Sequence, residues 1–188
     1  MDIETTRTVC WLLSYTFQYP DRDWRERLPA FREEAEGLPD PAAAAVLAAF
    51  LQLAEEADEM RWQDDYVRTF DFGRASNLYL TYGQYGEERD RGAALLELKR
   101  QYAAAGYELT GGELPDYLPL MLEFASAAPW ETSGALLGAR TQALESIRGK
   151  LAEANSPYAA LMELLLRIVP ATPSNEAQEA ILPARGGN

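Results

Sequence analysis

The sequence predicts an all-α fold, a single-domain bundle of about eight helices. Apolar residues recur at spacings of three and four along nearly the whole chain, which is the period of an amphipathic helix. The length of 188 residues is typical of one domain, and 47% apolar with 25% charged residues is the balance of a protein with a packed core. We expect the helical domain to cover residues 1–170 and the polar remainder, residues 171–188, to be a flexible tail.

Prolines and acidic caps mark the ends of the first two expected helices. The first ends before Pro20, and the apolar residues on its face are Val9, Leu12, Leu13 and Phe17. The second begins after Asp21, whose side chain can cap free backbone N–H groups, and it ends near Gly37. Pro29 lies inside this second segment, where we expect a kink or a break.

A third helix opens with Asp40 as its N-cap and Pro41 in its first turn. Its alanine-rich sequence favours helix, and its apolar stripe is Val46, Phe50, Leu53, Ala57 and Met60. The same period recurs at Trp62, Tyr66 and Phe70. The helix therefore either ends near Met60 or continues to Phe70.

Residues 71–86 interrupt the helical period. Glycines punctuate the segment, yet it is unusually rich in large apolar side chains: Phe72, Leu78, Tyr79, Leu80, Tyr82 and Tyr85. These side chains either fill the core behind a connecting loop or line a groove for a ligand. The sequence leaves both interpretations open.

Four more helices are expected in the remainder of the domain. The first ends at Gly106, and the second begins at Glu113 with Pro115 in its first turn. A third follows, and Ser156 with Pro157 caps the fourth. The apolar residues that mark these four helices are, in order, Leu95, Leu98, Tyr102 and Ala105; Leu118, Leu122 and Ala125; Leu137, Leu144, Ile147 and Leu151; Tyr158, Leu161, Leu165, Ile168 and Val169.

The residue types exclude several classes of function. The chain has no histidine and one cysteine, Cys10, which excludes His-dependent triads, His/Cys zinc sites and cysteine-ligated iron–sulfur clusters. We therefore expect no cofactor, no metal and no catalytic residue, and a buried, structural Cys10 rather than a reactive one. The enzymatic alternative that remains is a small helical enzyme that uses carboxylates alone.

The net charge of −13 has the wrong sign for binding nucleic acid through its phosphates. Residues 21–65 hold thirteen acidic and five basic residues, either as a solvated helical face or as an electrostatic funnel for a basic ligand. No apolar run approaches the roughly 20 residues that span a bilayer, and the N-terminus lacks the basic segment of a secretory signal. These features predict a cytoplasmic protein that neither binds nucleic acid nor inserts into a membrane.

Several motifs occur in order between residues 66 and 124. They are Tyr66–Asp71 (YVRTFD), Leu78–Tyr82 (LYLTY), Gly86–Gly92 (GEERDRG), Leu95–Lys99, Tyr102, Gly106, Glu113–Pro119 (ELPDYLP) and Leu122–Phe124 (LEF). This order and spacing resemble the NarJ-type chaperones, the delta subunits of respiratory nitrate reductase, within the wider TorD-like family. The likeness also includes the opening, Leu12 to Pro20, and extends to about residue 170.

The resemblance implies a TorD-like helical fold and no enzymatic activity. It implies a system-specific chaperone that binds the N-terminal segment of the apo catalytic subunit of respiratory nitrate reductase in the cytoplasm. There it would assist insertion of the molybdenum cofactor and assembly of the complex. The alternative within the family is a chaperone of a related molybdoenzyme of the selenate, chlorate or dimethyl sulfoxide reductase type.

We expect the peptide to bind between residues 70–82 and 113–123. The candidate residues are Phe70, Leu78, Tyr79, Tyr82, Arg91, Glu113, Asp116, Tyr117, Pro119 and Glu123. Asp116 and Glu123 lie seven apart, which puts them on one face if both belong to one helix, where they could receive basic side chains. The aromatic residues and Leu78 would take the apolar stripe of an amphipathic peptide helix.

Several of these residues and their neighbours also have a purely structural interpretation. Arg91 could form an internal ion pair with Glu123 or Asp116. Pro115 and Pro119 could have no role other than to shape the start of a helix. Tyr102 is expected in the core. Two positions depart from the family. Tyr117 stands where the family commonly has histidine, and it cannot become cationic near pH 6. Glu87, after Gly86, stands where the family has aspartate.

Overall fold

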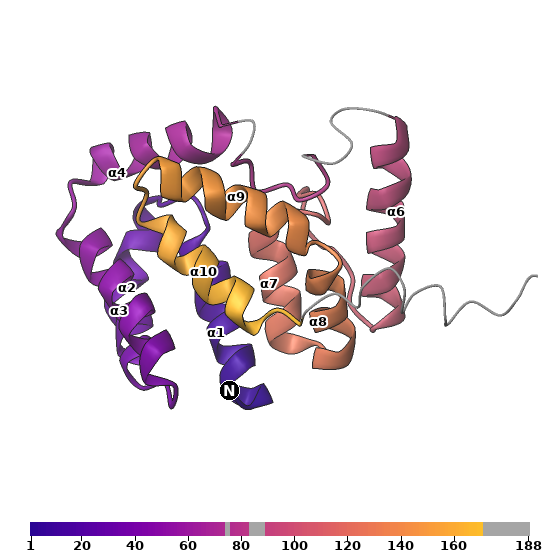
Figure 1. Cartoon of the computed structure of the whole chain (residues 1–188), viewed down its shortest axis with the longest axis horizontal. Coiled ribbons are helices and arrows are strands. Elements are labelled where there is room, and N and C mark those ends of the chain that lie inside the picture. The colour runs from indigo at the N-terminus through magenta and orange to yellow at the C-terminus, as the bar shows by residue number, and fades with distance from the viewer. Residues whose placement is uncertain (74–75, 83–88, 171–188) are drawn as a thin grey trace, which may run out of the picture.

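The computed structural model describes residues 1–73, 76–82 and 89–170, and these residues form an all-helical protein. They contain nine α-helices, which are labelled in Figure 1, and one π-helix. The helices are α1 (Ile3–Thr16), α2 (Arg22–Glu36), α3 (Pro41–Glu56), α4 (Glu59–Tyr66), the π-helix η1 (Val67–Asp71), α6 (Arg89–Ala104), α7 (Leu118–Ala127), α8 (Trp130–Gly138), α9 (Thr141–Glu153) and α10 (Tyr158–Ile168). The predicted fold class is confirmed, whereas the expected tail, residues 171–188, lies outside the described residues.

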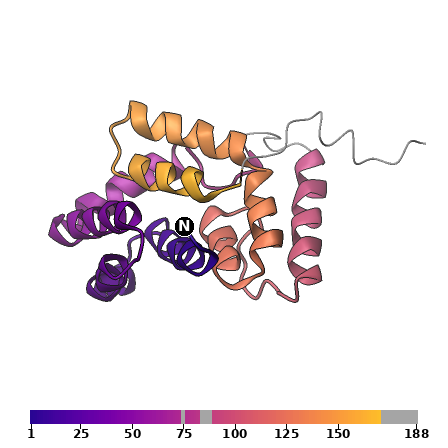
Figure 2. The same cartoon turned by 60° about the horizontal axis from the view of Figure 1, so that its bottom comes forward.

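Helix α1 lies at the centre of the molecule, in contact with α7, α2, α3 and α10 (Figures 1 and 2). Nine of its fourteen residues are buried, so it is the main element of the core. The Ser14 hydroxyl donates to the Pro119 carbonyl (2.9 Å), and the Arg7 guanidinium donates to the Ala128 carbonyl (2.8 Å). These two bonds attach α1 to both ends of α7 and fix the position of that helix.

The expected burial of Cys10 is confirmed, since this residue of α1 is fully buried in the core. Burial raises the pKa of the thiol to about 12, because the charged thiolate is poorly solvated in an apolar core. Cys10 is therefore protonated at neutral pH and is part of the packing.

Aspartate caps start the N-terminal helices as predicted. The Asp21 and Asp40 carboxylates accept hydrogen bonds from the backbone N–H groups of Trp24 and Ala43 (2.8 Å each). The Asp40 bond lowers the pKa of that carboxyl group, because the charged form is the better acceptor. Pro29 does not break α2, which continues to Glu36.

Both expected ends of the third helix are wrong. Helix α3 ends at Glu56, and α4 begins at Glu59 with Asp58 as its N-cap. The interruption is stabilised from α2, because the Arg25 guanidinium donates to the Ala57 carbonyl (2.8 Å). The Asp58 carboxylate accepts from the Arg61 N–H (2.9 Å), so the sequence around Asp58 begins a new helix instead of continuing the old one.

Helix α6 confirms its prediction, and Gly106 follows it with a φ of +85°, the left-handed conformation that glycine adopts without strain. Leu98 and Tyr102 anchor α6 by their buried side chains. Figures 1 and 2 both show this helix at the edge of the molecule opposite α2 and α3. Tyr102 is a core residue, as expected.

The next two expected helices need correction. Helix α7 begins at Leu118 rather than at Glu113, because the preceding residues form an extended pairing, described below. The following predicted helix is two helices, since α8 ends at Gly138 and α9 starts at Thr141. At the break, the Thr141 hydroxyl donates to the Gly138 carbonyl (2.8 Å). The last helix, α10, is confirmed.

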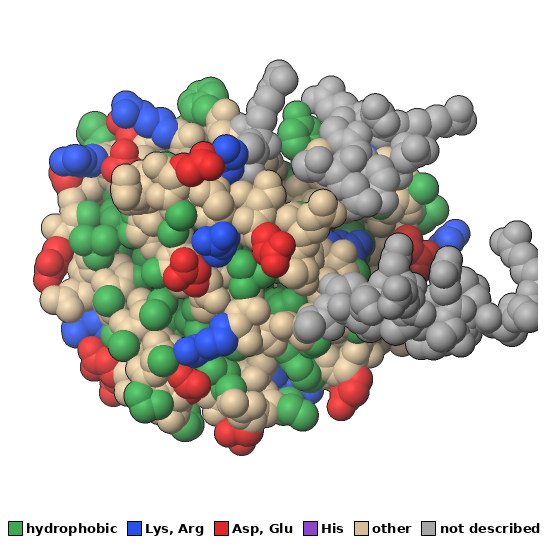
Figure 3. All heavy atoms as spheres, in the orientation of Figure 1, with side chains coloured by type: hydrophobic (Ala, Val, Ile, Leu, Met, Phe, Trp, Pro, Cys, Tyr) green, Lys and Arg blue, Asp and Glu red, His purple; other side chains and the backbone are tan. Residues whose placement is uncertain are grey.

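Surface charges are interspersed with hydrophobic side chains on the face seen in Figure 3. Within residues 21–65, Arg32 pairs with Glu36 and with Glu55 (3.2 Å each), and Arg22 pairs with Glu26 (2.9 Å). These pairs favour the solvated-face interpretation of the acidic segment, while the funnel stays a hypothesis. No helix in the described part of the chain combines the length and the apolar content that crossing a membrane requires.

Candidate functional site

The candidate site is built where two irregular segments pair in extended conformation. The Leu118 N–H donates to the Leu78 carbonyl (2.9 Å), and the Leu80 N–H donates to the Asp116 carbonyl (3.0 Å). Tyr79 and Tyr117 face each other in the resulting antiparallel bridge, with ring centroids 5.1 Å apart. The pairing explains why α7 begins only at Leu118, since residues held in extended backbone cannot also be helical.

Beside this bridge is a pocket of about 220 Å³. It is lined by Tyr19, Tyr66, Phe70, Asp71, Asn77, Leu78, Tyr79 and Tyr117. Four of the ten predicted binding residues therefore lie together around one hollow, which we call the tyrosine pocket. Its walls are mainly aromatic, and the phenol hydroxyls add polar groups around them.

The floor of the tyrosine pocket belongs to the core. Tyr66 and Phe70 are buried, with ring centroids 4.9 Å apart, and the Phe70 ring lies 4.9 Å from that of Tyr158 in α10. The Tyr66 hydroxyl donates to the Phe17 carbonyl (2.9 Å) and lies 3.4 Å from the Tyr117 hydroxyl. Because these rings are packed and hydrogen-bonded, the floor is preorganised for an incoming side chain.

The π-helix η1 supplies one wall. It continues directly from α4, and the Phe72 N–H donates to the Val67 carbonyl (3.1 Å), a bond across five residues. Such wide turns are rare and are often found at functional sites. The turn places Phe70 in the pocket floor and Asp71 in the lining, while Phe72 is 79% exposed.

Gly73 allows the chain to turn sharply after η1. A Cβ atom at this position would lie 2.1 Å from the Ser76 hydroxyl oxygen and 2.4 Å from the Thr69 carbonyl oxygen. The Ser76 hydroxyl donates to that same carbonyl. A side chain at position 73 would therefore separate the end of η1 from the residues that lead to Tyr79.

We expect Gly73→Ala to lower the free energy of unfolding by about 1–3 kcal/mol, the usual cost of overpacking. Urea unfolding followed by circular dichroism measures it. Gly149→Ala in α9 is the control, because its added Cβ meets no atom within 4 Å and alanine favours helix. A Gly73→Ala protein that unfolds at the wild-type urea concentration would show that this close approach is unimportant.

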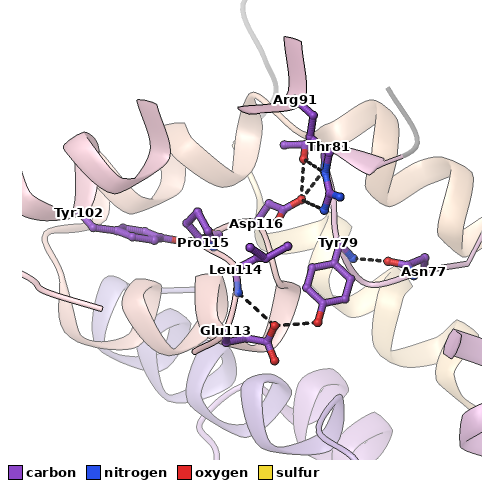
Figure 4. Close-up of polar contacts among 9 residues, drawn as sticks. All are labelled: Asn77, Tyr79, Thr81, Arg91, Tyr102, Glu113, Leu114, Pro115 and Asp116. Atoms are coloured by element: carbon purple, nitrogen blue, oxygen red, sulfur yellow. Dashed lines mark hydrogen bonds and ion pairs between the residues drawn. The ribbon is translucent and has the colours of Figure 1, made fainter. Parts of the chain in front are cut away.

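Asp116 is not the surface ligand that the sequence suggested. Its side chain is 0% exposed, and it precedes α7, so it does not share a helical face with Glu123. One carboxylate oxygen, Oδ2, accepts from the Thr81 N–H (3.1 Å) and the Thr81 hydroxyl (2.5 Å) and pairs with Arg91 (3.4 Å), as Figure 4 shows. Asp116 thus holds the residues after Tyr79 in place.

Arg91 confirms one of its structural interpretations, the ion pair with Asp116. Its guanidinium also donates to the Thr81 hydroxyl (3.1 Å). The guanidinium carbon lies over two rings, 6.0 Å from the centroid of Tyr79 and 5.5 Å from that of Tyr82. Arg91 connects α6 to the back of the tyrosine pocket, because the Tyr79 ring that it contacts is also part of the pocket lining.

The remaining candidates lie at different depths. Glu113 is exposed and accepts a hydrogen bond from the Tyr79 hydroxyl (2.7 Å), so it is next to the pocket. Pro119 is buried in the first turn of α7, and Glu123 is exposed further along that helix. Pro115 is buried ahead of α7 and accepts the Tyr102 hydroxyl bond (2.8 Å). Tyr85 and Glu87 lie outside the described residues.

Burial raises the pKa of the phenols of Tyr66, Tyr79 and Tyr117. For Tyr79, the hydrogen bond to Glu113 raises it further. A raised phenol pKa keeps the hydroxyl neutral at all physiological pH values. The pocket therefore offers neutral hydroxyl groups and aromatic surface rather than phenolate charge.

Sequence reasoning missed four residues of the pocket: Tyr19, Tyr66, Asp71 and Asn77. Tyr66 and Asp71 are the first and last residues of one quoted motif, and Tyr19 precedes Pro20 in the opening segment. The motifs and the opening segment therefore already contained three of these four residues. Of the large apolar side chains in residues 71–86, Leu78 and Leu80 are buried in the core, and Tyr79 lines the pocket. That this pocket binds a ligand stays a hypothesis.

Comparison with known proteins identifies the family. A model of the family described as "Nitrate reductase delta subunit" matches residues 35–163, which include every residue of the tyrosine pocket except Tyr19. The chain belongs to the nitrate reductase delta subunit family. The resemblance stated from the motifs is thereby confirmed.

Two relatives in the nitrate reductase delta subunit family are similar over most of the chain. The "probable nitrate reductase molybdenum cofactor assembly chaperone NarJ" of Bacillus subtilis (strain 168) is 37% identical over 154 residues, 82% of this chain and 84% of the relative. The nitrate reductase molybdenum cofactor assembly chaperone NarJ of Escherichia coli (strain K12) is 35% identical over 160 residues, 84% of this chain and 67% of the relative.

A solved structure has the same fold. The crystal structure of a proposed redox enzyme maturation protein from Archaeoglobus fulgidus superposes with a TM-score of 0.63 over 86% of this chain and 91% of that one. The two sequences are 23% identical. In the described ranges of the present chain, no group of three or more acidic or cysteine side chains is arranged to hold a metal ion.

Proposed function

We propose that this protein is a system-specific chaperone that binds the N-terminal segment of the apo catalytic subunit of respiratory nitrate reductase. In this role it assists insertion of the molybdenum cofactor and assembly of the complex, and it acts in the cytoplasm without being an enzyme. Its membership of the nitrate reductase delta subunit family supports the chaperone role, as do relatives named as assembly chaperones. The observation that supports the peptide site is the tyrosine pocket.

The size of the tyrosine pocket suits a peptide side chain. Its volume of about 220 Å³ is below the roughly 300–1,000 Å³ of sites for small molecules and cofactors. Aromatic walls favour an apolar side chain, and an amphipathic helix presents such side chains along one face. The hydroxyls of Tyr66, Tyr79 and Tyr117 can meet polar atoms at the edge of that face.

The experiment uses a synthetic peptide that copies the first 30 residues of the nitrate reductase catalytic subunit encoded by the same genome. Titration calorimetry should show binding, and circular dichroism should show that the peptide gains helix on contact. Apolar burial should supply most of the affinity, at about 25 cal/mol per Å² before ordering costs. If the segment is basic, the net charge of −13 should mainly speed association, and this effect should weaken as salt rises.

A peptide of the same composition in scrambled order is the control, because it keeps the charge and destroys the apolar face. Equal affinity for both peptides would reduce the interaction to non-specific charge attraction. Failure of the native peptide to bind at low and at high salt would overturn the proposed client segment.

A further inference from the structure

A second pocket lies along α7, beyond the tyrosine pocket. It has a volume of about 210 Å³ and is enclosed by the loop that follows α6 and by the outer face of α7. Its apolar lining comes mainly from Tyr107, Leu109, Leu120 and Phe124. Two of the ten predicted binding residues, Glu113 and Glu123, belong to its lining.

The charges at this pocket have one sign. Glu108, Glu113 and Glu123 are exposed carboxylates in its lining, which contains no lysine or arginine. Across the described ranges 1–73, 76–82 and 89–170, none of the three forms an ion pair. An apolar hollow with unpaired carboxylates at its edge is complementary to a side chain that has an aliphatic stem and a cationic end.

The walls of the two pockets are linked in two ways. Glu113 lines the second pocket, and its carboxylate accepts the hydrogen bond from the Tyr79 hydroxyl, which belongs to the first. Tyr117 is the N-cap of α7, and Leu120, Phe124 and Ala127 follow it at helical spacing on the side that lines the second pocket. A peptide that leaves the tyrosine pocket along α7 therefore reaches the second pocket directly.

We propose that the second pocket binds a lysine or arginine side chain of the same client segment. Its aliphatic stem packs against Leu120 and Phe124, and its cationic end lies among Glu108, Glu113 and Glu123. The inference rests on the proposed function and deepens it, because it makes a basic residue at a fixed place in the segment a condition of tight binding. The tyrosine pocket selects an apolar side chain, and the second pocket selects a positively charged one.

The test is a double variant, Glu108→Gln with Glu123→Gln, which removes two charges and keeps the side-chain shapes. Glu113 is left unchanged, because it holds Tyr79. Affinity for the 30-residue client peptide should fall about fivefold to tenfold at low ionic strength, as expected for two solvated ion pairs, and the loss should shrink at high salt. The matched control is Glu131→Gln with Glu145→Gln, which changes the net charge equally at exposed positions of α8 and α9.

Peptides in which each lysine or arginine is replaced singly by glutamine identify the partner residue. One of them should bind the wild-type protein fivefold to tenfold more weakly and lose nothing further with the double variant. If the double variant and the control bind the client peptide equally, the second pocket does not select charge, while the proposed function stands. If the wild-type protein does not bind the client peptide at all, the proposed function fails first and this inference fails with it.

Discussion

Replacing Tyr117 by alanine should weaken binding of the client peptide about tenfold to a hundredfold, the loss expected for a buried aromatic anchor of roughly 1–3 kcal/mol. The change removes a wall of the tyrosine pocket, the ring contact with Tyr79 and the hydroxyl beside Tyr66. The main effect should be faster dissociation, because the lost contacts form only after encounter. Surface plasmon resonance with immobilised peptide measures both rate constants.

Tyr117→Phe is the matched control, because it keeps the ring and removes only the hydroxyl. Its affinity should remain within about threefold of wild type, since the 3.4 Å approach to Tyr66 is a long hydrogen bond. Because the phenol pKa is raised, wild-type Tyr117 stays neutral as pH falls from 8 to 5 and contributes no pH dependence. A folded Tyr117→Ala protein that releases the peptide at the wild-type rate would place the site elsewhere.

Replacing Asp116 by lysine should lower the free energy of unfolding by about 3–5 kcal/mol, the cost of breaking a buried ion pair. The fully buried position would then hold a cation beside Arg91 and would lose both bonds to Thr81. Urea unfolding measures this loss. Lys99→Asp on the exposed side of α6 is a control for charge reversal, and it should change stability by less than about 0.5 kcal/mol.

Asp116→Asn separates the contribution of shape from that of charge. The amide oxygen can still accept from Thr81, so this variant should lose less stability than the lysine variant. If Asp116→Lys instead unfolds like the wild type and only binds peptide more weakly, Asp116 is a surface ligand after all.

The helices with simple periodicity were predictable. Asp21 and Asp40 cap as expected because an N-cap depends on neighbouring residues alone. The apolar stripes likewise predicted which faces of α1, α6 and α10 are buried. What failed were boundaries that depend on distant partners, such as the end of α3, where Arg25 of α2 donates to the Ala57 carbonyl.

The site was predictable in part for the same reason. All of the pocket residues except Asn77 belong to the motifs or to the opening segment that the resemblance includes. The high density of aromatic residues is also visible in the sequence. The role of Asp116 was not visible, because its spacing from Glu123 fits a helical face as well as it fits a loop before a helix. Only the pairing of residues 78–80 with 116–118, nearly forty positions apart, decides between them.

The π-helix makes the tyrosine pocket depend on the length of the chain as well as on its side chains. A π turn contains one residue more than the α turn that it replaces, so deleting a single residue from Val67–Asp71 allows ordinary helical winding after α4. The five residues that now bring Phe70 into the pocket floor and Asp71 into its lining would become four, and at least one of their side chains would lose its place at the pocket. In this segment, a one-codon deletion should therefore do more harm than most substitutions, and natural variants should differ here in residue type more often than in residue number.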